Sequence, residues 1–444
     1  MEILIKNGNI INPDNSQILD ILIQNGHIAQ VGKNLKVAVS QTRVIDASDR
    51  YIFPGGIDPH VHLHLPTPAG FSSDDFYSGS RAALFGGTTT LIDFVTPHRG
   101  QSLVDALVER KAEAASSLIA TYFHVSPVEW RDSTADEILE CVHEYGIKSF
   151  KCYMAYKNNI GLDDDDLFKV MLVVGKAGGL VMLHCEDGDA IERLRHQYAQ
   201  REMPAAKAHL MSRPPELEAE AVKTAIALAK KAKCPIYIVH VSSLLSLAHI
   251  KEAQKNGQQV YAETCPQYLL LDKSKYDLDF EKAAAFVMSP PLRTTTDNEA
   301  LWEALAKGSI ATVGTDHCPF MLKQKMVGKS DFRKIPNGAG GIEHRLALLF
   351  SYGYLKNKIN LQRFVDLTST RASQIFGLFP QKGILAEGAN ADLLIWNPKT
   401  ANIISSQSHH QNCDLNIYEG FPTIGHPEIV IADGKIRIEN GKLI

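Results

Sequence analysis

Eight short apolar segments alternate with amphipathic segments along the middle of this chain, and this order limits the folds open to it. We predict strands at residues 57–63, 88–94, 120–127, 149–154, 180–186, 236–242, 259–266 and 310–319. Between many of them, apolar residues recur at three- and four-residue spacing, as in ELEAEAVKTAIALAKKA and SLLSLAHIKEAQKNG, which predicts helices. Eight strands that alternate with helices predict an α/β fold, specifically a (β/α)₈ barrel.

The two ends of the chain have a different pattern, with short strands separated by tight turns. ILIKNGNII and ILIQNGHIAQVG lie near the start, and EIVIADGKIRIENGKLI lies at the end. Asn-Gly pairs favour hairpin turns, so we expect the strands to break there. Neither end is long enough to bury a core alone, and we expect both to form one small β-sandwich. The predicted domains are therefore 1–52 and 388–444 for the sandwich and 53–387 for the barrel.

Composition excludes several classes of protein. The chain has 444 residues, of which 45% are apolar and 22% charged, with a net charge of −4. No basic stripe favours nucleic acid or an anionic membrane. No stretch approaches the ~20 apolar residues of a membrane span, and the first residues lack the apolar core of a signal peptide. The seven cysteines are scattered without a CxxC pair, so we expect reduced thiols and a cytoplasmic location.

Polar residues near the ends of the predicted strands are candidate metal ligands. His60 and His62 are two residues apart, so they project from one face of an extended strand. Imidazole and carboxylate groups suit zinc and similar divalent ions. In a parallel barrel these strand ends meet on one face, where active sites lie. The candidates of this kind are His60, His62, His184, His240 and Asp316. We expect His64 at the rim, and His124 and His317 in structural or supporting roles.

Lys151 lies in the predicted strand 149–154, but an ammonium group cannot bind a cation. One interpretation is a buried ion pair or an exposed lysine. The alternative is a desolvated, neutral amine that reacts with carbon dioxide to give a carbamate, which can bridge two metals as a carboxylate does. The residue type alone does not choose between them.

Several motifs together resemble a known family. HVHLH, SFKCYMAYK, LVMLHCED, IVHVSS and TDHCPF resemble the amidohydrolase superfamily, and ETCPQYLLLD, SPPLR, GTDHCPF and PNGAGGIEHR resemble its hydantoinase/dihydropyrimidinase family of cyclic amidases. The similarity covers nearly the whole chain in the expected order. It implies two divalent ions, for which we expect zinc, bridged by N6-carboxylated Lys151. It assigns His60, His62 and Asp316 to one ion, and His184 and His240 to the second.

The resemblance also implies an activity, the opening of dihydropyrimidines or 5-substituted hydantoins to N-carbamoyl amino acids. Asp316 would move the proton between the nucleophile and the leaving nitrogen. Tyr156 would donate a hydrogen bond to the oxyanion, and Ser289 and Asn337 would bind the amide edge of the substrate. Without the resemblance, Tyr156 would be a packed aromatic residue, Ser289 an ordinary serine, and Asn337-Gly338 a turn.

Two alternatives remain at this stage. A related cyclic amidase, such as an allantoinase or a phenylhydantoinase, would differ only in its pocket. A non-catalytic interaction protein on the same fold would be expected to lack metal ligands. His64 stands where relatives that open dihydroorotate carry an arginine, which counts against that substrate. Leu65, Cys152, Tyr153 and Ile160 match loop positions that shape the pocket.

The expected partners follow from the same resemblance. They are a small cyclic amide and further copies of the chain, in a homodimer or homotetramer, with no nucleic acid and no membrane. The dimer is favoured because the chain stops soon after ENGKLI, where many members continue with a basic tail.

Overall fold

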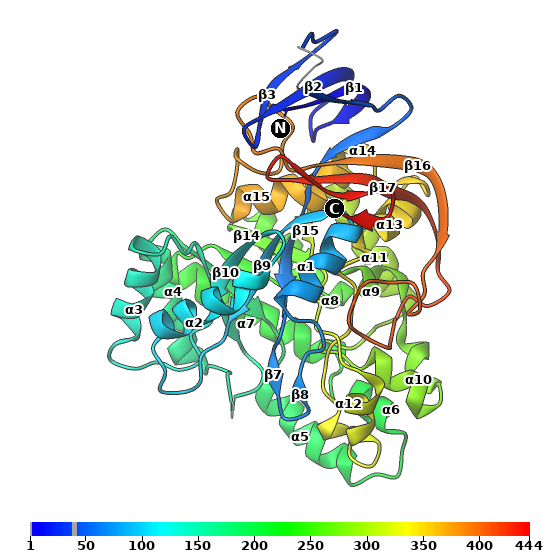
Figure 1. Cartoon of the computed structure of the whole chain (residues 1–444). Coiled ribbons are helices and arrows are strands. Elements are labelled where there is room, and N and C mark those ends of the chain that lie inside the picture. Colours follow the sequence, from blue (N-terminus) through cyan, green and yellow to red (C-terminus); the bar gives the residue numbers. More distant parts are fainter. Residues whose placement is uncertain (1, 38–41, 158) are drawn as a thin grey trace.

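The centre of the protein is a barrel of eight parallel strands, seen in a computed structural model that describes residues 2–37, 42–157 and 159–444 (Figure 1). Their order in the sheet is β15-β14-β13-β12-β11-β10-β9-β6. The strands are β6 (Gly56–Val61), β9 (Thr88–Val95), β10 (Ala120–Val125), β11 (Ser149–Tyr153), β12 (Leu180–His184), β13 (Ile236–Ile238), β14 (Val260–Thr264) and β15 (Thr312–Val313). The predicted (β/α)₈ barrel is confirmed, although most strands end a few residues before their predicted limits.

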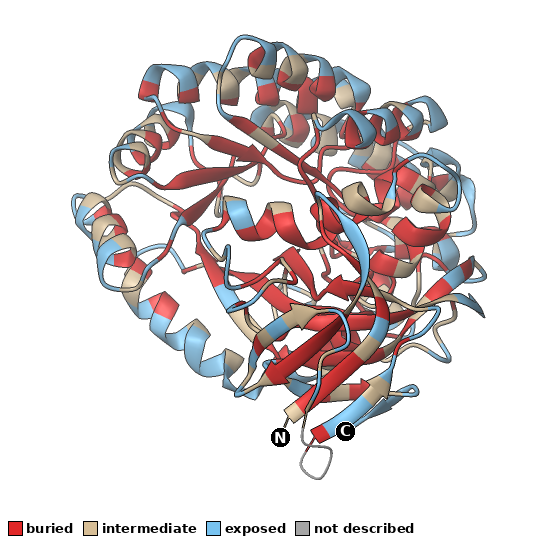
Figure 2. Cartoon of the chain, turned by 90° about the horizontal axis from the view of Figure 1, so that it is seen from above, coloured by how far each residue is buried: buried red, intermediate tan, exposed pale blue. Residues whose placement is uncertain are grey.

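Helices surround these strands, with buried faces toward the barrel and exposed faces outward (Figure 2). The two amphipathic patterns in the sequence coincide with α7 (Pro215–Ala232) and α8 (Leu244–Lys255). The other barrel helices are α1 (Phe76–Phe85), α2 (Leu103–Glu113), α3 (Thr134–His143), α4 (Asp164–Lys176), α11 (Thr295–Lys307), α13 (Arg345–Leu349), α14 (Leu361–Val365) and α15 (Arg371–Ile375). No helix in these described ranges is long and apolar enough to cross a membrane.

The connections that follow the strands gather at one end of the barrel (Figure 1). They carry the hairpin β7 (Pro66–Thr67) and β8 (Gly70–Phe71), and the helices α5 (Gly188–Ala199), α6 (Ala205–Met211), α9 (Pro266–Leu270), α10 (Phe280–Ala283) and α12 (Leu322–Lys325). The predicted metal ligands lie at this end, because they stand at or near the carboxyl ends of the barrel strands.

The two ends of the chain pair with each other, as predicted, and they lie at the opposite end of the barrel (Figure 1). Their nine strands form one sheet in the order β19-β18-β17-β16-β5-β1-β2-β3, with β4 paired to β1. The strands are β1 (Glu2–Ile11), β2 (Ser16–Gln24), β3 (His27–Gly32), β4 (Thr42–Asp46), β5 (Tyr51–Pro54), β16 (Leu393–Ile403), β17 (Pro422–Ala432), β18 (Lys435–Glu439) and β19 (Lys442–Leu443). Buried side chains of this sheet, many of them isoleucines, form an apolar cluster separate from the core of the barrel. The domain limits at residues 52 and 387 stay predictions.

The Asn-Gly pairs differ in what they build. Asn25-Gly26 joins β2 to β3, and Asn440-Gly441 joins β18 to β19, so both hairpin turns are confirmed. The prediction that the strand breaks at Asn7-Gly8 is wrong, because β1 continues through this pair with a register shift against β2. Asn7 adopts a φ of 60°, and a Cβ on Gly8 would lie 2.2 Å from Ile52. The pair therefore forms a β-bulge, where β1 changes partner from β4 to β5.

Arg345 closes the barrel between its first and last strands. The guanidinium is fully buried and donates to the carbonyl of Ile57 on β6, at 2.7 Å, and of Val313 on β15, at 2.9 Å. The Asp58 carboxylate lies 4.0 Å from the guanidinium and accepts hydrogen bonds from the amide and hydroxyl of Thr315. One cation and one carboxylate thus join two strands that do not pair with each other in the described chain, where an isolated bridge links Val61 on β6 to His317 beyond the end of β15.

We predict that Arg345→Met lowers the free energy of unfolding by about 3–5 kcal/mol, because it leaves the buried Asp58 charge without its partner. The matched control is Arg371→Met, since Arg371 is 42% exposed and its pair with Asp366 spans 3.4 Å. Asp366 keeps its second partner, Arg363, in this control, so the loss of the more exposed cation should cost only about 0–1 kcal/mol. Urea denaturation of both variants would measure the difference, and equal losses would contradict the role of Arg345 in closing the barrel.

Candidate metal centre and active site

Three of the predicted ligands meet where β6 and β15 close. His60 Nε2 and His62 Nε2 lie 3.3 Å apart, and Asp316 Oδ1 lies 3.1 Å from the first and 3.2 Å from the second. His60 uses its Nδ1 hydrogen in a bond to Glu263, so its Nε2 lone pair faces the carboxylate. Acceptors that face one another repel unless a cation lies among them. This group could therefore hold a metal ion.

The other two histidines adjoin this group. The rings of His184 and His240 are 4.6 Å apart, and the ring of His240 is 5.5 Å from that of His60. The Tyr156 ring lies 5.4 Å from that of His184. The structure thus brings the five histidine and aspartate candidates together at one end of the barrel, with the predicted oxyanion donor beside them.

Lys151 is buried among aromatic rings. Its side chain is almost fully inaccessible, and Nζ lies 4.6 Å from the ring centre of Phe94 and 4.9 Å from that of Tyr153. The Phe94 ring also contacts both His60 and His62, so the amine lies close to the first ligand group. Burial lowers the pKa of Lys151 to about 8, which increases the share of neutral amine. The alternative of an exposed lysine is therefore wrong.

A buried glutamate orients the first ligand group. Glu263, on β14, accepts from His60 Nδ1 at 2.6 Å, from the Tyr237 hydroxyl at 2.8 Å and from the His240 amide at 3.3 Å. A Cβ on Gly314 would lie 2.5 Å from this carboxylate, so only glycine leaves room for it. Sequence reasoning missed Glu263; the one signal for it is an acidic residue within the apolar predicted strand 259–266.

A second buried carboxylate orients His184. Glu186 accepts from His184 Nε2 at 2.7 Å and pairs with the guanidinium of Arg213. That guanidinium also lies 5.4 Å from the ring centre of Tyr156. A continuous path therefore leads from His184, a predicted metal ligand, to the phenol of Tyr156. Glu186 stands two residues after His184 in HCED, which is the only signal that the sequence offers for it.

Burial keeps most of these imidazoles neutral, which is the state that binds metal. It lowers the pKa of His62 to about 4 and holds that of His240 well below its usual value. Nδ1 of His62 is buried without a hydrogen-bond partner among the described residues. His62, Asp316 and Tyr156 are partly exposed, whereas the other ligand side chains are buried. The centre therefore has a dry floor and one accessible side.

The two predicted substrate-binding residues lie at this end of the barrel, in two segments that a backbone hydrogen bond joins. Ser289 is buried, and its hydroxyl has no hydrogen-bond partner in the described chain. Asn337 is partly exposed in the segment after α12, where the Gly338 amide donates to the Val287 carbonyl at 3.0 Å.

The structure corrects two of the predicted loop positions and places the remaining histidines. Cys152 and Tyr153 are buried on β11 and not in a loop, because the strand continues to Tyr153. His64 lies after β6 with its ring stacked on Phe71, at 4.1 Å. His124 is buried and bonds to the carbonyl of Pro59 at 3.0 Å.

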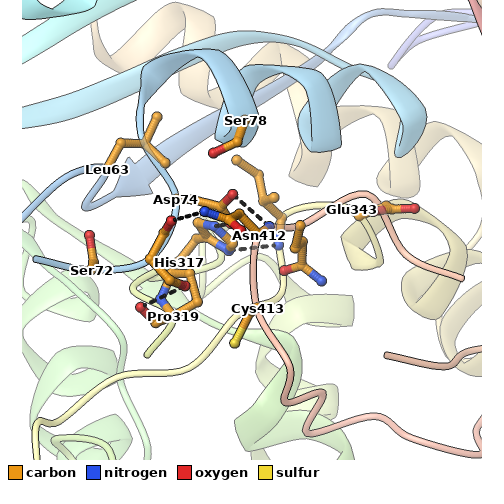
Figure 3. Close-up of polar contacts among 12 residues, drawn as sticks. Leu63, Ser72, Asp74, Ser78, His317, Pro319, Glu343, Asn412 and Cys413 are labelled. Carbon is orange, nitrogen blue, oxygen red and sulfur yellow. Dashed lines mark hydrogen bonds and ion pairs between the residues drawn. The ribbon is translucent and has the colours of Figure 1, made fainter. Parts of the chain in front are cut away.

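His317, directly after Asp316, is held in a polar network (Figure 3). Its Nε2 donates to Asp74 at 3.0 Å, and its Nδ1 accepts from the Gly341 amide at 3.1 Å. The second oxygen of Asp74 accepts from the Asn412 amide at 2.9 Å, so the connection between β16 and β17 also takes part. The His317 carbonyl accepts from the His62 amide at 2.8 Å. This network fixes the backbone on which Asp316 stands.

The amidohydrolase family matches residues 51–437. A D-hydantoinase of Geobacillus stearothermophilus is 42% identical over 443 residues, which are 99% of this chain and 94% of the relative. The chain belongs to the amidohydrolase family. Within the family, dihydropyrimidinase 1 of Caenorhabditis elegans is 40% identical over 447 residues, or 99% of this chain and 91% of the relative.

Solved structures agree with the family assignment. The crystal structure of a dihydropyrimidinase from Brevibacillus agri NCHU1002 matches with a TM-score of 0.98 and 40% identity, over 100% of this chain and 96% of the other. An L-hydantoinase from Arthrobacter aurescens matches with a TM-score of 0.90 and 28% identity, over 100% and 97%. The resemblance seen in the motifs is thereby confirmed.

We predict that Glu263→Gln weakens metal binding by about 10- to 100-fold, as loss of a carboxylate behind a ligating histidine commonly does. The amide keeps one acceptor oxygen for three donors, so either the Tyr237 hydroxyl or both His60 and the His240 amide lose their acceptor. Zinc retained against a competing chelator would measure the effect. Glu303→Gln is the control, because Glu303 is exposed on α11 and pairs with Lys307 on the same helix. Equal zinc retention in both variants would contradict the role of Glu263.

Proposed function

We propose that this chain is a two-metal hydrolase that opens the cyclic amide bond of dihydropyrimidines or 5-substituted hydantoins to give N-carbamoyl amino acids. The observation that carries the proposal is the meeting of His60, His62 and Asp316 beside His184 and His240 in a member of the amidohydrolase family. The similarity to proteins named D-hydantoinase and dihydropyrimidinase over nearly the full chain supports the substrate class.

The donor groups suit two divalent ions, for which we propose zinc. His60, His62 and Asp316 would hold one ion, and His184 and His240 would hold the second. Lys151, carboxylated by carbon dioxide, would bridge them. Its burial beside Phe94 lowers its pKa to about 8 despite the charges of Asp316 and Glu263, which supports a neutral amine that can react. The ions supply a hydroxide nucleophile near neutral pH and polarise the scissile carbonyl.

The residues of the chain would then move the proton and stabilise the charge. Asp316 is the partly exposed carboxylate of the group, and it would accept the proton of the nucleophile and return it to the leaving nitrogen. Tyr156 is also partly exposed, with its ring 5.4 Å from that of His184, and its hydroxyl would donate a hydrogen bond to the developing oxyanion. Arg213 packs on the face of this phenol and so limits its movement.

Ser289 and Asn337 would hold the amide edge of the ring. The Ser289 hydroxyl without a partner is a group that a substrate can satisfy. The related cyclic amidases, an allantoinase or a phenylhydantoinase, remain the alternative, because they differ in the pocket and not in the metal centre. A non-catalytic interaction protein is disfavoured, since every predicted ligand is present. The homo-oligomer and the cytoplasmic location stay predictions.

The test is ring opening by purified protein that has been reconstituted with zinc and bicarbonate. We expect chelator-sensitive turnover of dihydrouracil, hydantoin or 5-phenylhydantoin, and little turnover of allantoin or dihydroorotate. Lys151→Ala is the inactive control and should lose bound metal and activity together, because the bridging group is gone. Preference for allantoin or dihydroorotate would keep the metal chemistry and overturn the substrate assignment. A protein that binds no metal and opens no ring would overturn the proposal.

We predict that Tyr156→Phe keeps both metals and lowers kcat by about 10²- to 10³-fold, the usual effect of removing one oxyanion donor. The reason is that the phenyl ring still packs on Arg213 and His184 but has no hydroxyl. Metal content and steady-state rates on the best substrate would measure this. Tyr122→Phe is a suitable control, because Tyr122 is an exposed tyrosine on β10. A wild-type rate in Tyr156→Phe would remove the phenol from the mechanism.

A further inference from the structure

One buried cation outside the metal centre has no acidic partner among the described residues. Lys325, the last residue of α12, is 1% exposed. Its Nζ donates to three backbone carbonyls: Val287 at 2.9 Å, Pro336 at 2.7 Å and Gly338 at 2.7 Å. The Phe320 ring lies 5.5 Å away. Three N–H groups thus meet three acceptors, which satisfies the ammonium group completely.

The three carbonyls belong to the two segments that carry the proposed substrate-binding residues. Pro336 and Gly338 flank Asn337, and Val287 stands two residues before Ser289. The two segments also bond to each other directly, because the Gly338 amide donates to the Val287 carbonyl at 3.0 Å. The ammonium group therefore lies at the junction of the two segments and ties each of them to α12.

Stability alone does not favour a lysine here. A buried cation loses its hydration, and an apolar residue of similar volume is often equally or more stabilising. Burial lowers the pKa of Lys325 to about 7, with only the neutral thiols of Cys318 and Cys413 nearby among titratable groups. What the ammonium adds is direction, since its three bonds fix the positions of three carbonyls relative to one another.

Other contacts make the segment after α12 a fixed edge. The Cys318 amide donates to the Ala339 carbonyl at 3.0 Å, and the Gly341 amide donates to His317 at 3.1 Å. Gly338 has a φ of 146°, and a Cβ there would lie 2.4 Å from the Cys318 carbonyl. The backbone from residue 336 to residue 341 is therefore held against the strand end that carries Asp316.

We propose that Lys325 is a positioning residue that sets the spacing between Ser289 and Asn337, and thereby the fit of the amide edge of the substrate. This proposal rests on the proposed function. Lys325 does not touch substrate; it acts through the carbonyls on either side of Asn337 and through Val287. Glu263 and Glu186 orient His60 and His184, and the Lys325 ammonium group makes no hydrogen bond to either glutamate in the described chain.

Lys325→Met tests the proposal, because methionine has a similar length but no donors. We expect KM for hydantoin or dihydrouracil to rise by about 10- to 100-fold, while kcat changes by less than about threefold, since misplacement by ~1 Å has effects of this size. Zinc content should equal that of the wild type. Amide hydrogen exchange of residues 335–341 should be faster in the variant. Lys325→Gln, which keeps a shorter donor, replaces it if Lys325→Met does not fold.

Lys323→Met is the matched control, because it is the same substitution at an exposed position of the same helix. It should leave KM, kcat and exchange unaltered. A folded Lys325 variant with wild-type KM and wild-type exchange would overturn the proposal, and so would loss of zinc or an equal loss of kcat without a change in KM. A wild type that opens no cyclic amide would overturn the proposed function instead, and the exchange rates would still decide whether Lys325 anchors the segment.

Discussion

The metal centre depends on the closure of the barrel between β6 and β15. His60 and His62 stand on or directly after the first barrel strand, and Asp316 follows the last, so they meet only if these strands lie side by side. The strands are joined by Arg345, by Asp58 with Thr315, and by the bond from the His62 amide to the His317 carbonyl. Each bond lies within a few residues of a ligand. The contacts that complete the fold therefore also set the distances in the site.

Carboxylates behind the ligands then determine how the ligands face. Glu263 fixes which nitrogen of His60 is free, and Glu186 does the same for His184, so both histidines present one lone pair to the interior of the site. Glu186 also pairs with Arg213, whose guanidinium lies on the Tyr156 ring. A single buried ion pair thus supports a ligand on one side and the proposed oxyanion donor on the other.

The sequence predicted those features that depend on local periodicity and on strand ends. The alternation of strands and helices, the two His60 and His62 side chains on one face, and the Asn25-Gly26 turn all follow from short-range geometry. The bulge at Asn7 did not, because its form depends on pairing with β2, β4 and β5. The sequence also did not predict the roles of Glu263 and Lys325. The His60 partner of Glu263 lies far away in the chain, and the partners of Lys325 are backbone carbonyls that no side-chain pattern marks.

The floor and the edge of the site are held by different physical means, and this bears on how specificity can change. Side-chain charges on the strands orient the ligands, whereas backbone carbonyls around Lys325 hold the edge that carries Ser289 and Asn337. Leu65 and Ile160 lie in the loops after β6 and β11. Neither residue takes part in the hydrogen bonds that Glu263, Glu186 and Lys325 make with the described residues. Substitutions there can alter the pocket while the metal centre is retained. Ser289 and Asn337, in contrast, are coupled through one ammonium group, so a shift of either segment changes the position of the other.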